Sequence, residues 1–397
     1  MRYVVIGNGV AGVTAVQILA KEKNTESTIT QFSDEPFGYY NRPKIPAFVG
    51  NNEVSVEETI TYGMDWYKTI AVDLHMQEKV ERIDTVKQEL ETKEATYPFD
   101  RLLIATGADC WCPPIEGREL KHFYAMRNLS DALKIRKRFK TSNKTVIIGG
   151  GVLGLEMANA AINQKQKTTV VEFAPYLLPR QLDQEGSNVL QRILETKGME
   201  ILVGKEVQRI TGEKEVSQVI TKDGIEIPAE IVIACTGITP RVNLVKDILE
   251  VNRGIIVNDF METSSEDIFA AGDCAEHKGI VYGLIPPSMQ QARIAAHNMI
   301  RKDLEYHGSK FAATLKVTDL FLSSFGYMGQ EHDLGYEMRK YINDEEYVKL
   351  FIHKDKIKAA IILGVRKAIP IVRNLFTQEK SVSENEKKIR EVLPDLS

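Results

Sequence analysis

Two glycine-rich turns of one type, starting 142 residues apart, constrain this chain of 397 residues more than any other feature. Residues 7–12 read GNGVAG and residues 149–154 read GGGVLG, so both have the spacing GxGxxG. Each turn follows a short β-branched run, at residues 3–6 and 145–148. Continuous apolar runs of this length are typical of buried parallel strands, so each turn is predicted to end such a strand.

The three glycines of such a turn have separate physical tasks. The first permits the tight turn, the second lets the backbone approach a pyrophosphate, and the third lets the following helix pack on the strand. The N-terminus of that helix favours the charge of the phosphates. We expect the two helices over residues 11–21 and 154–164. One such turn is a weak signal, but two with the correct flanking elements predict two dinucleotide sites.

Each unit is also expected to place an acidic residue at the end of its second strand, where a carboxylate accepts hydrogen bonds from ribose hydroxyls. Glu172 occupies this place after the predicted strand 168–171. A carboxylate there repels a 2′-phosphate, because two unit charges about 4 Å apart at an effective dielectric constant near 20 interact by roughly 4 kcal/mol. The second site is therefore predicted to prefer NAD to NADP. In the first unit the strand is 27–32 and the acid is Asp34 or Glu35, of which we favour Glu35.

Length and charge narrow the class of protein further. A chain of 397 residues is too long for one hydrophobic core, so two or three domains are expected. Lysine plus arginine (51) nearly balance aspartate plus glutamate (55), so no basic field attracts nucleic acid or anionic lipid. No apolar run approaches the ~18 residues of a membrane helix, and the first strand leaves no room for a cleavable signal. We expect a cytoplasmic protein with neither a nucleic-acid nor a membrane partner.

The cysteines are too few for a disulfide framework in a chain of this length: Cys110, Cys112, Cys235 and Cys274. Cys110 and Cys112 are the one close pair. They could form a redox dithiol or half of a metal site, although no second cysteine or histidine cluster completes four ligands. We expect an ordinary loop and no bound metal, and whether the pair is redox-active stays open.

The segments after the two turns repeat one plan. Residues 71–99 alternate in a way that predicts short antiparallel strands, and a strand at 101–107 then returns to the first sheet. Residues 205–227 predict a hairpin region with a turn at 223–224, followed by a closing strand at 231–235. Both closing strands end in Thr-Gly, which together with the repeated glycine turn predicts an internal repeat of domain size.

Prolines and changes of pattern predict the domain boundaries. The pair Pro113 and Pro114 marks a linker, because consecutive prolines stiffen the chain and cannot continue a sheet. A strand at 268–273 and a helix opening at Pro286 and running to about Met299 return the chain to its first domain. The C-terminal part is predicted as short strands followed by a charged tail that is either an exposed helix or a mobile end. These strands are expected at 311–317, 320–327, 336–342, 347–353 and 357–364, and the tail from Glu379.

The predicted fold class is thus α/β, with two Rossmann-like dinucleotide-binding domains and a small C-terminal α+β domain. The first domain is discontinuous, at 1–112 and 241–308, the second spans 113–240, and the third spans 309–397.

Seven ordered motifs resemble the FAD- and NAD-dependent pyridine nucleotide oxidoreductases, and within them the NADH:rubredoxin reductase branch. They are also similar to the flavin domain of assimilatory nitrite reductases. The resemblance covers almost the whole chain, with motifs at residues 5–12, 40–43, 105–107, 149–156, 178–183, 236–240 and 271–273.

The resemblance implies which residues hold the cofactors, with the first domain binding FAD and the second NAD. The FAD residues are Gly7, Gly9, Gly12, Glu35, Arg42, Thr106 and Asp273, the last on the ribityl chain. The NAD residues are Gly149, Gly151, Gly154, Glu156 and Glu172. Further candidates for cofactor binding are Val10, Ala11, Asp34, Pro43, Val80, Ala105, Gly107, Val152, Leu153, Thr236, Gly237, Gly272 and Pro286. The helix that opens at Pro286 would aim its N-terminus at the flavin pyrimidine ring, where its partial positive charge favours an anionic reduced flavin.

The same resemblance implies hydride transfer between NAD(H) and FAD, followed by single-electron exchange with rubredoxin, ferredoxin or an iron-sulfur partner. No catalytic acid or base is nominated, because the protein supplies orientation and electrostatics. Thiol-relay relatives need a cysteine near the flavin, and residues 37–46 contain none. Three alternatives stay open: an electron-transfer subunit of a larger oxidoreductase, an NADH oxidase that uses O2, and an NAD(H)-sensing flavoprotein. The acceptor, the physiological direction and the oligomeric state are not encoded in any motif.

Overall fold

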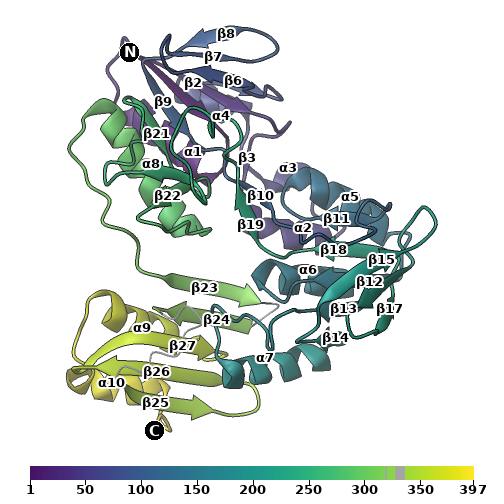
Figure 1. Cartoon of the computed structure of the whole chain (residues 1–397). Coiled ribbons are helices and arrows are strands. Elements are labelled where there is room, and N and C mark those ends of the chain that lie inside the picture. Colours follow the sequence, from purple (N-terminus) through teal and green to yellow (C-terminus); the bar gives the residue numbers. More distant parts are fainter. Residues whose placement is uncertain (318–319, 327–335) are drawn as a thin grey trace. The chain divides into compact units, whose positions relative to one another are not determined.

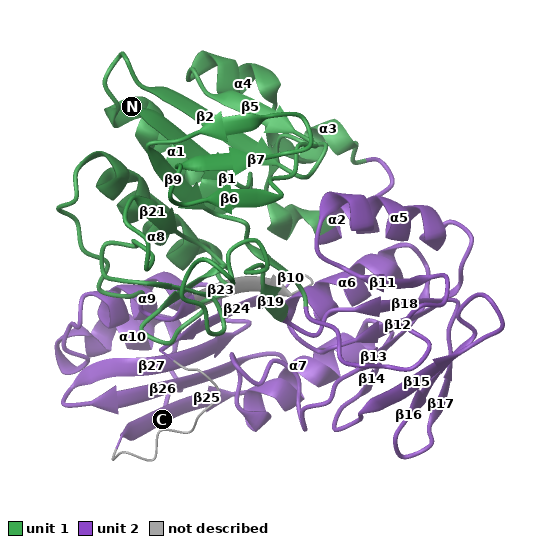
Figure 2. Cartoon of the chain, turned by 45° about the horizontal axis from the view of Figure 1, so that its top comes forward, with its two compact units in different colours: residues 1–45, 54–110, 238–309 green, residues 46–53, 111–237, 310–397 purple. Residues whose placement is uncertain are grey.

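The computed structural model describes residues 1–317, 320–326 and 336–397 (Figure 1). The chain divides into two compact units, each made of segments distant in sequence (Figure 2). Unit 1 contains Met1–Ile45, Val54–Cys110 and Ile238–Ser309. Unit 2 contains Pro46–Glu53, Trp111–Gly237 and Lys310–Ser397.

Unit 1 is built on a five-stranded parallel sheet in the order β21-β9-β1-β2-β5. The strands are β1 (Arg2–Ile6), β2 (Thr28–Ser33), β5 (Asp73–Met76), β9 (Arg101–Ile104) and β21 (Ile268–Ala270). The predicted strands at 3–6 and 27–32 are confirmed within one residue at each end. The predicted strands at 101–107 and 268–273 also form, but they end earlier, at Ile104 and Ala270. The sheet core is almost fully apolar, as expected for a parallel sheet covered on both faces.

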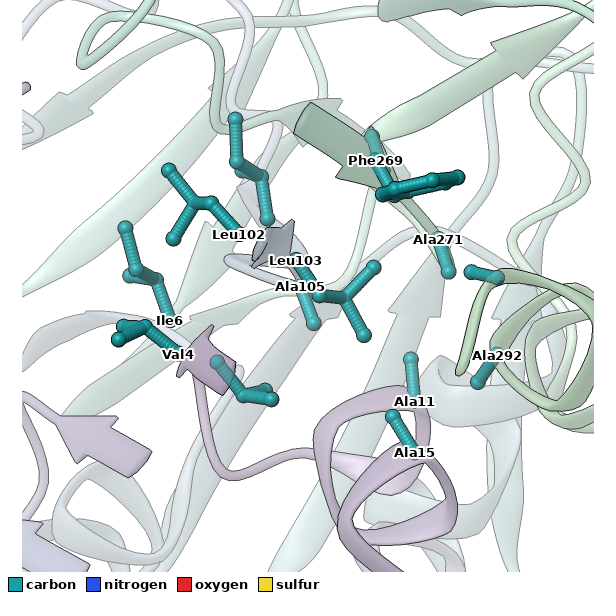
Figure 3. Packing of buried hydrophobic residues seen from close by; sticks show 14 of the residues in the cluster. Val4, Ile6, Ala11, Ala15, Leu102, Leu103, Ala105, Phe269, Ala271 and Ala292 are labelled. Atoms are coloured by element: carbon teal, nitrogen blue, oxygen red, sulfur yellow. The ribbon is translucent and has the colours of Figure 1, made fainter. Parts of the chain in front are cut away.

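Two helices, α1 (Val10–Glu22) and α8 (Ile285–Ile300), pack against each other beside this sheet. Both confirm predicted helices. Figure 3 shows Ala11 and Ala15 of α1 turned toward Ala292 of α8, and all three side chains are buried. Small side chains at the contact let the two helices approach closely.

The prediction for residues 71–99 is partly wrong. Strands β6 (Arg82–Asp84), β7 (Glu89–Glu91) and β8 (Thr96–Pro98) do form an antiparallel sheet. Asp73–Met76 instead pairs in parallel with β2, because Leu74 fills the core of the main sheet. Unit 1 also contains shorter elements: β3 (Tyr39–Tyr40), η1 (Arg42–Lys44), α3 (Val56–Thr59), β4 (Ile60–Tyr62), α4 (Met64–Thr69), β10 (Ala108–Cys110), β19 (Ile238–Pro240), β20 (Ile255–Val257) and β22 (Ala275–His277).

Unit 2 repeats the plan with a second five-stranded parallel sheet, in the order β11-β18-β12-β13-β14. Its strands are β11 (Phe123–Ala125), β12 (Lys144–Ile148), β13 (Lys167–Val171), β14 (Met199–Leu202) and β18 (Ile231–Ala234). In both sheets the closing strand lies directly beside the strand that precedes the glycine turn, which confirms the predicted repeat. The predicted hairpin region is a three-stranded antiparallel sheet of β15 (Val207–Thr211), β16 (Gln218–Thr221) and β17 (Glu226–Pro228). The helices are α2 (Ile45–Gly50), which begins one residue before this unit, α5 (Leu129–Phe139), α6 (Val152–Asn163) and α7 (Gln184–Thr196).

The five strands predicted in the C-terminal part of the chain form one antiparallel sheet of unit 2, in the order β23-β24-β27-β26-β25. The strands are β23 (Ala312–Val317), β24 (Leu320–Phe325), β25 (Glu337–Ile342), β26 (Tyr347–His353) and β27 (Lys356–Leu363). The predicted end of the second strand at position 327 lies outside the described residues. Helix α9 (Ala368–Thr377) packs on this sheet.

Of the two alternatives predicted for the tail, the helix forms, but one side of the tail is buried rather than exposed. After η2 (Ser383–Asn385), helix α10 (Glu386–Val392) packs against α9. Val382, Ile389, Leu393 and Leu396 are all buried in the C-terminal core. Four apolar residues among many charged ones are enough to bury one side of the tail.

One buried cluster joins α7 to the C-terminal sheet. Asp183 caps α7 by accepting from the backbone N–H of Gly186 (3.0 Å). The same carboxylate accepts from the Tyr347 hydroxyl (2.6 Å) and pairs with the Lys349 ammonium (2.9 Å). This pairing lets two charged groups be buried together.

None of the helices in the described part of the chain combines the length and the apolar character needed to cross a bilayer.

Candidate functional site

The first glycine turn has the backbone geometry that its sequence predicts. Gly7 has a φ of +110°, and a β-carbon there would overlap the carbonyl oxygen of Ala105. A β-carbon on Gly12 would overlap the carbonyl oxygen of Gly7. Glycine is therefore required at both positions for strand, turn and helix to pack. The side chain of Gln31 on β2 supports the turn by donating to the Gly7 carbonyl (2.9 Å).

Gly9 differs from these two because its α-carbon faces open space. A β-carbon there would have no atom within 4 Å, and its backbone is extended (φ −80°, ψ −172°). Gly9 is the N-cap of α1, and among the described residues no side-chain cap accepts a hydrogen bond from the first turn of that helix. The N–H groups of Val10, Ala11 and Gly12 therefore stand at an open helix N-terminus, which is the arrangement that binds phosphate. The residues present fit a dinucleotide pyrophosphate.

The acid at the end of β2 is held by side chains. Glu35 accepts from the Tyr40 hydroxyl and pairs with the guanidinium of Arg42 at 3.3 Å. Glu35 is half-buried, whereas Asp34 is exposed and pairs with Arg241 at 3.3 Å. The preference for Glu35 over Asp34 as the ribose ligand stays a prediction.

The segment after β9 is tied to a distant part of unit 1. The Thr106 hydroxyl donates to the Arg241 carbonyl (2.9 Å), and the Arg241 N–H donates to the Gly107 carbonyl (2.9 Å). The guanidinium of Arg241 also pairs with Asp109 at 2.6 Å. Arg241 was not among the predicted site residues, since nothing in its local sequence shows that it meets residues more than 130 positions away.

The segment after β21 approaches the first turn of α1. A β-carbon on Gly272 would come 3.0 Å from the β-carbon of Ala11, and the Gly272 N–H donates to the Gln291 side chain on α8 (2.9 Å). Asp273 follows and is half-buried. Pro286 lies in the first turn of α8, whose N-cap has no side-chain hydrogen bond. The structure thus brings Gly272 next to Ala11, and so to the predicted turn at residues 7–12, at one edge of the sheet.

The other predicted residues of unit 1 lie in η1, in the hydrophobic core or after β9. Pro43 lies with Arg42 in η1, and the side chains of Ala105 and Val80 are buried in the core. Gly107 has a φ of +70°.

The second glycine turn repeats the first almost residue for residue. Gly149 has a φ of +109°, and a β-carbon there would lie 2.5 Å from the Cys235 carbonyl oxygen. A β-carbon on Gly154 would overlap the Gly149 carbonyl oxygen. Gly151 is the extended N-cap of α6, has open space beside its α-carbon and has no side-chain cap. The N–H groups of Val152 and Leu153 are in the open first turn of α6, so a second pyrophosphate fits here.

Glu172 follows β13 directly, as predicted, and is held by backbone groups. The N–H of Ala174 donates to one carboxylate oxygen (2.6 Å), and the N–H of Gly150 donates to the other. Thr236 and Gly237 come just after β18, and the α-carbon of Thr236 would lie 3.5 Å from a β-carbon on Gly149. Gly237 has a φ of +123°.

Glu156, on the second turn of α6, has an unusual titration. Burial raises the pKa of Glu156 to about 7. It has no hydrogen bond or ion pair within the described residues, so nothing compensates its charged form. A half-buried carboxyl beside a glycine turn that titrates near neutral pH is typical of functional sites.

Comparison with known proteins agrees with this geometry. Residues 1–298 match the family described as pyridine nucleotide-disulphide oxidoreductase. The chain belongs to this family. Residues 312–380 match the C-terminal domain of rubredoxin NAD+ reductase.

Individual relatives of the family cover most of the chain. The nitrite reductase [NAD(P)H] of Bacillus subtilis is 32% identical over 97% of this chain and 48% of its own length. The NADH-rubredoxin oxidoreductase of Clostridium acetobutylicum is 27% identical, with 91% of each chain covered. The solved NAD-dependent persulfide reductase from A. fulgidus superposes with a TM-score of 0.89 at 26% identity, covering 97% of this chain and 78% of that one. The chain spans about half the length of the first curated relatives that it matches.

Membership of this family supports FAD and NAD(H) as the two cofactors. Both glycine turns are present, one in each unit, and each is open at its second glycine. The described residues include no cluster of histidine, cysteine or acidic side chains suited to a metal ion.

We expect Glu156→Gln to change how stability depends on pH. The folded-state pKa of about 7 lies above the ordinary value of 4.5, so the Glu156 contribution to stability is fully present below about pH 4.5 and lost as pH rises through 7. The neutral amide removes this loss. The free energy of unfolding of the variant, relative to that of the native protein, should therefore be higher at pH 8 than at pH 5, by on the order of 1 kcal/mol for a half-buried group. The difference in melting temperature between the two proteins should rise accordingly. Thermal unfolding at both pH values checks this, and an equal difference at both would contradict the assignment.

Proposed function

We propose that this chain is an FAD-dependent oxidoreductase that exchanges hydride with NAD(H) and passes electrons to or from a one-electron carrier protein. The observation that carries the proposal is the pair of open glycine turns, one in each compact unit, at the N-termini of α1 and α6. A protein that bound one dinucleotide would need one such turn.

The cofactors would carry out the electron transfer, and the residues of the chain would bind the cofactors. When bound, FAD accepts a hydride from the nicotinamide and can release the electrons one at a time. The open N–H groups of Val10–Gly12 would hold the pyrophosphate of FAD, and those of Val152–Gly154 that of NAD. Glu35 and Glu172 would bind the adenosine riboses. Hydride exchange between NAD(H) and FAD needs no thiol relay, which agrees with the absence of cysteine from residues 37–46.

A rubredoxin-type carrier is the proposed acceptor because residues 312–380 match the rubredoxin NAD+ reductase C-terminal domain. The NADH-rubredoxin oxidoreductase of Clostridium acetobutylicum also covers 91% of this chain. The test is reoxidation of the NADH-reduced protein without oxygen by rubredoxin or by a [2Fe–2S] ferredoxin. The rate of reoxidation by O2 is measured separately, without a carrier. Reoxidation by a carrier at a rate well above that by O2 supports the proposal. Rapid reoxidation by O2 alone would favour an NADH oxidase.

A second candidate is an electron-transfer module of a larger reductase. It is favoured by the match to Bacillus subtilis nitrite reductase [NAD(P)H], of which the chain covers 48%. A reduced protein that no free carrier reoxidises, but that a co-purifying partner does, would select this candidate.

The domain assignment and the location are part of the proposal. FAD is assigned to 1–112 with 241–308, NAD to 113–240, and the α+β domain to 309–397. The cytoplasm is the proposed location, in keeping with NAD(H) as the substrate.

Glu172→Gln is expected to narrow the preference for NADH over NADPH by about tenfold or more, because it removes the negative charge that repels a 2′-phosphate. The measurement is kcat/KM for both dinucleotides. Glu195→Gln, which neutralises an exposed carboxylate on α7 in the same unit, is the control and should leave the ratio unchanged. An unaltered ratio in Glu172→Gln would show that another residue discriminates.

A further inference from the structure

The two turns differ in the residue between the first and second glycines of the GxGxxG spacing, which is glycine in only one of them. The first turn has Asn8 between its first two glycines and the second has Gly150. Gly150 is not forced by its backbone, because its φ lies outside the left-handed region. Its neighbours give the reason for glycine instead. A β-carbon on Gly150 would lie 2.6 Å from a methyl carbon of Leu177 and 3.0 Å from the β-carbon of Glu172.

The backbone of Gly150 also holds the Glu172 carboxylate directly. Its N–H donates to one carboxylate oxygen while the Ala174 N–H donates to the other at 2.6 Å. The Gly150 carbonyl accepts from the Leu178 N–H at 3.2 Å, so the segment that carries Ala174 and Leu177 lies along the turn. The carboxylate is thus enclosed between the turn and this segment, and any side chain at position 150 would separate the two.

The first turn holds its acid differently, and the contrast has a consequence for charge. Glu35 pairs with the Arg42 guanidinium at 3.3 Å, which partly offsets its charge. Glu172 is held by two neutral N–H groups, and no lysine or arginine pairs with it among the described residues. The two N–H donors therefore fix the place of the Glu172 carboxylate, and one of them belongs to Gly150.

We propose that Gly150 is a positioning residue for Glu172 and through it sets the preference of the second site for NADH over NADPH. This rests on the proposed function, because it assumes that the second turn binds a nicotinamide dinucleotide. A side chain at position 150 would push the carboxylate from its two N–H donors, so that it no longer meets the ribose hydroxyls or repels a 2′-phosphate from the correct position. The displaced carboxylate would weaken the binding of NADH, so we expect KM to change rather than kcat.

The test is a double-mutant cycle of Gly150→Ala and Glu172→Gln, with kcat and KM measured for NADH and NADPH. Gly150→Ala is expected to raise the KM for NADH and to lower the NADH to NADPH ratio of kcat/KM by about tenfold, with kcat and the flavin content kept. In the Glu172→Gln background the same change should have little further effect on the ratio, because the group that Gly150 positions is already neutral.

Two results would overturn the proposal: an equal loss of kcat/KM for both dinucleotides, or the same change of ratio with and without Glu172. Because Leu177 supplies the nearest atom to the new β-carbon, the cycle is repeated in a Leu177→Ala background, so that a folding defect of Gly150→Ala alone does not decide the outcome. Failure of the proposed function is separate, since the native protein would then oxidise neither dinucleotide.

Discussion

Gly9→Val is expected to give a folded protein that does not retain FAD. The backbone of Gly9 is extended and a β-carbon there meets no atom within 4 Å, so a side chain can branch from this position without a clash at its β-carbon. Its methyl groups would fill the space in front of the α1 N-terminus, where the pyrophosphate must come close to the backbone. We expect FAD affinity to fall at least ~100-fold, which corresponds to about 2.8 kcal/mol or more. The ratio of absorbance at 450 nm to that at 280 nm in the purified protein measures the loss.

Gly63→Val is the matched control for this change. Gly63 is also an extended helix N-cap in unit 1, at the start of α4, and a β-carbon there also meets nothing within 4 Å. This variant should keep its flavin. If Gly9→Val retained FAD as well as Gly63→Val does, the first turn would not be the flavin site.

Gly151→Val is expected to give the opposite result, a protein that retains FAD but is no longer reduced by NADH at ordinary concentrations. Gly151 has the same extended backbone and the same open space as Gly9, but it lies at the N-terminus of α6 in unit 2. The methyl groups would exclude the NAD pyrophosphate, so the KM for NADH should rise ~100-fold or more. The flavin band should be unchanged, and dithionite should still bleach it.

The pair of variants separates the two sites. Loss of flavin from Gly151→Val, or normal reduction of its flavin by low NADH, would contradict the assignment of one cofactor to each turn. Circular dichroism and the melting temperature show whether either variant fails for lack of folding.

The two glycine turns could be predicted from sequence because their signal is local. The strand, the tight turn and the helix are adjacent in the chain, and Gly7, Gly12, Gly149 and Gly154 are each required by a clash that glycine alone avoids. The internal repeat could be predicted for the same reason, and the two sheets place their corresponding strands in the same order.

What sequence could not supply depends on contacts between distant segments. Asp73–Met76 was assigned to an antiparallel region because a short alternating run does not reveal its partner, which is β2. The burial of one side of the tail is not evident from the sequence, because its four buried residues, Val382, Ile389, Leu393 and Leu396, are spread among charged ones. Arg241 reaches Asp34 and Asp109 across more than 130 positions, a contact without any local signature.

The function of Gln31 could have been suspected from sequence. Gln31 lies between Thr30 and Phe32 in β2 and is fully buried, and a buried amide side chain needs a hydrogen-bond partner. The structure supplies that partner as the Gly7 carbonyl. A polar residue in a predicted buried strand next to a glycine turn is thus a usable signal for turn support.

The most direct test of the central claim is an anaerobic titration of the FAD-loaded protein with NADH, followed at the flavin band near 450 nm. The account predicts that the band bleaches in proportion to NADH and is fully bleached at about one equivalent, since one hydride carries two electrons. A flavin that stays oxidised in excess NADH would contradict the claim that the two turns serve one reaction. A protein that binds no FAD on reconstitution would contradict the assignment of the first turn.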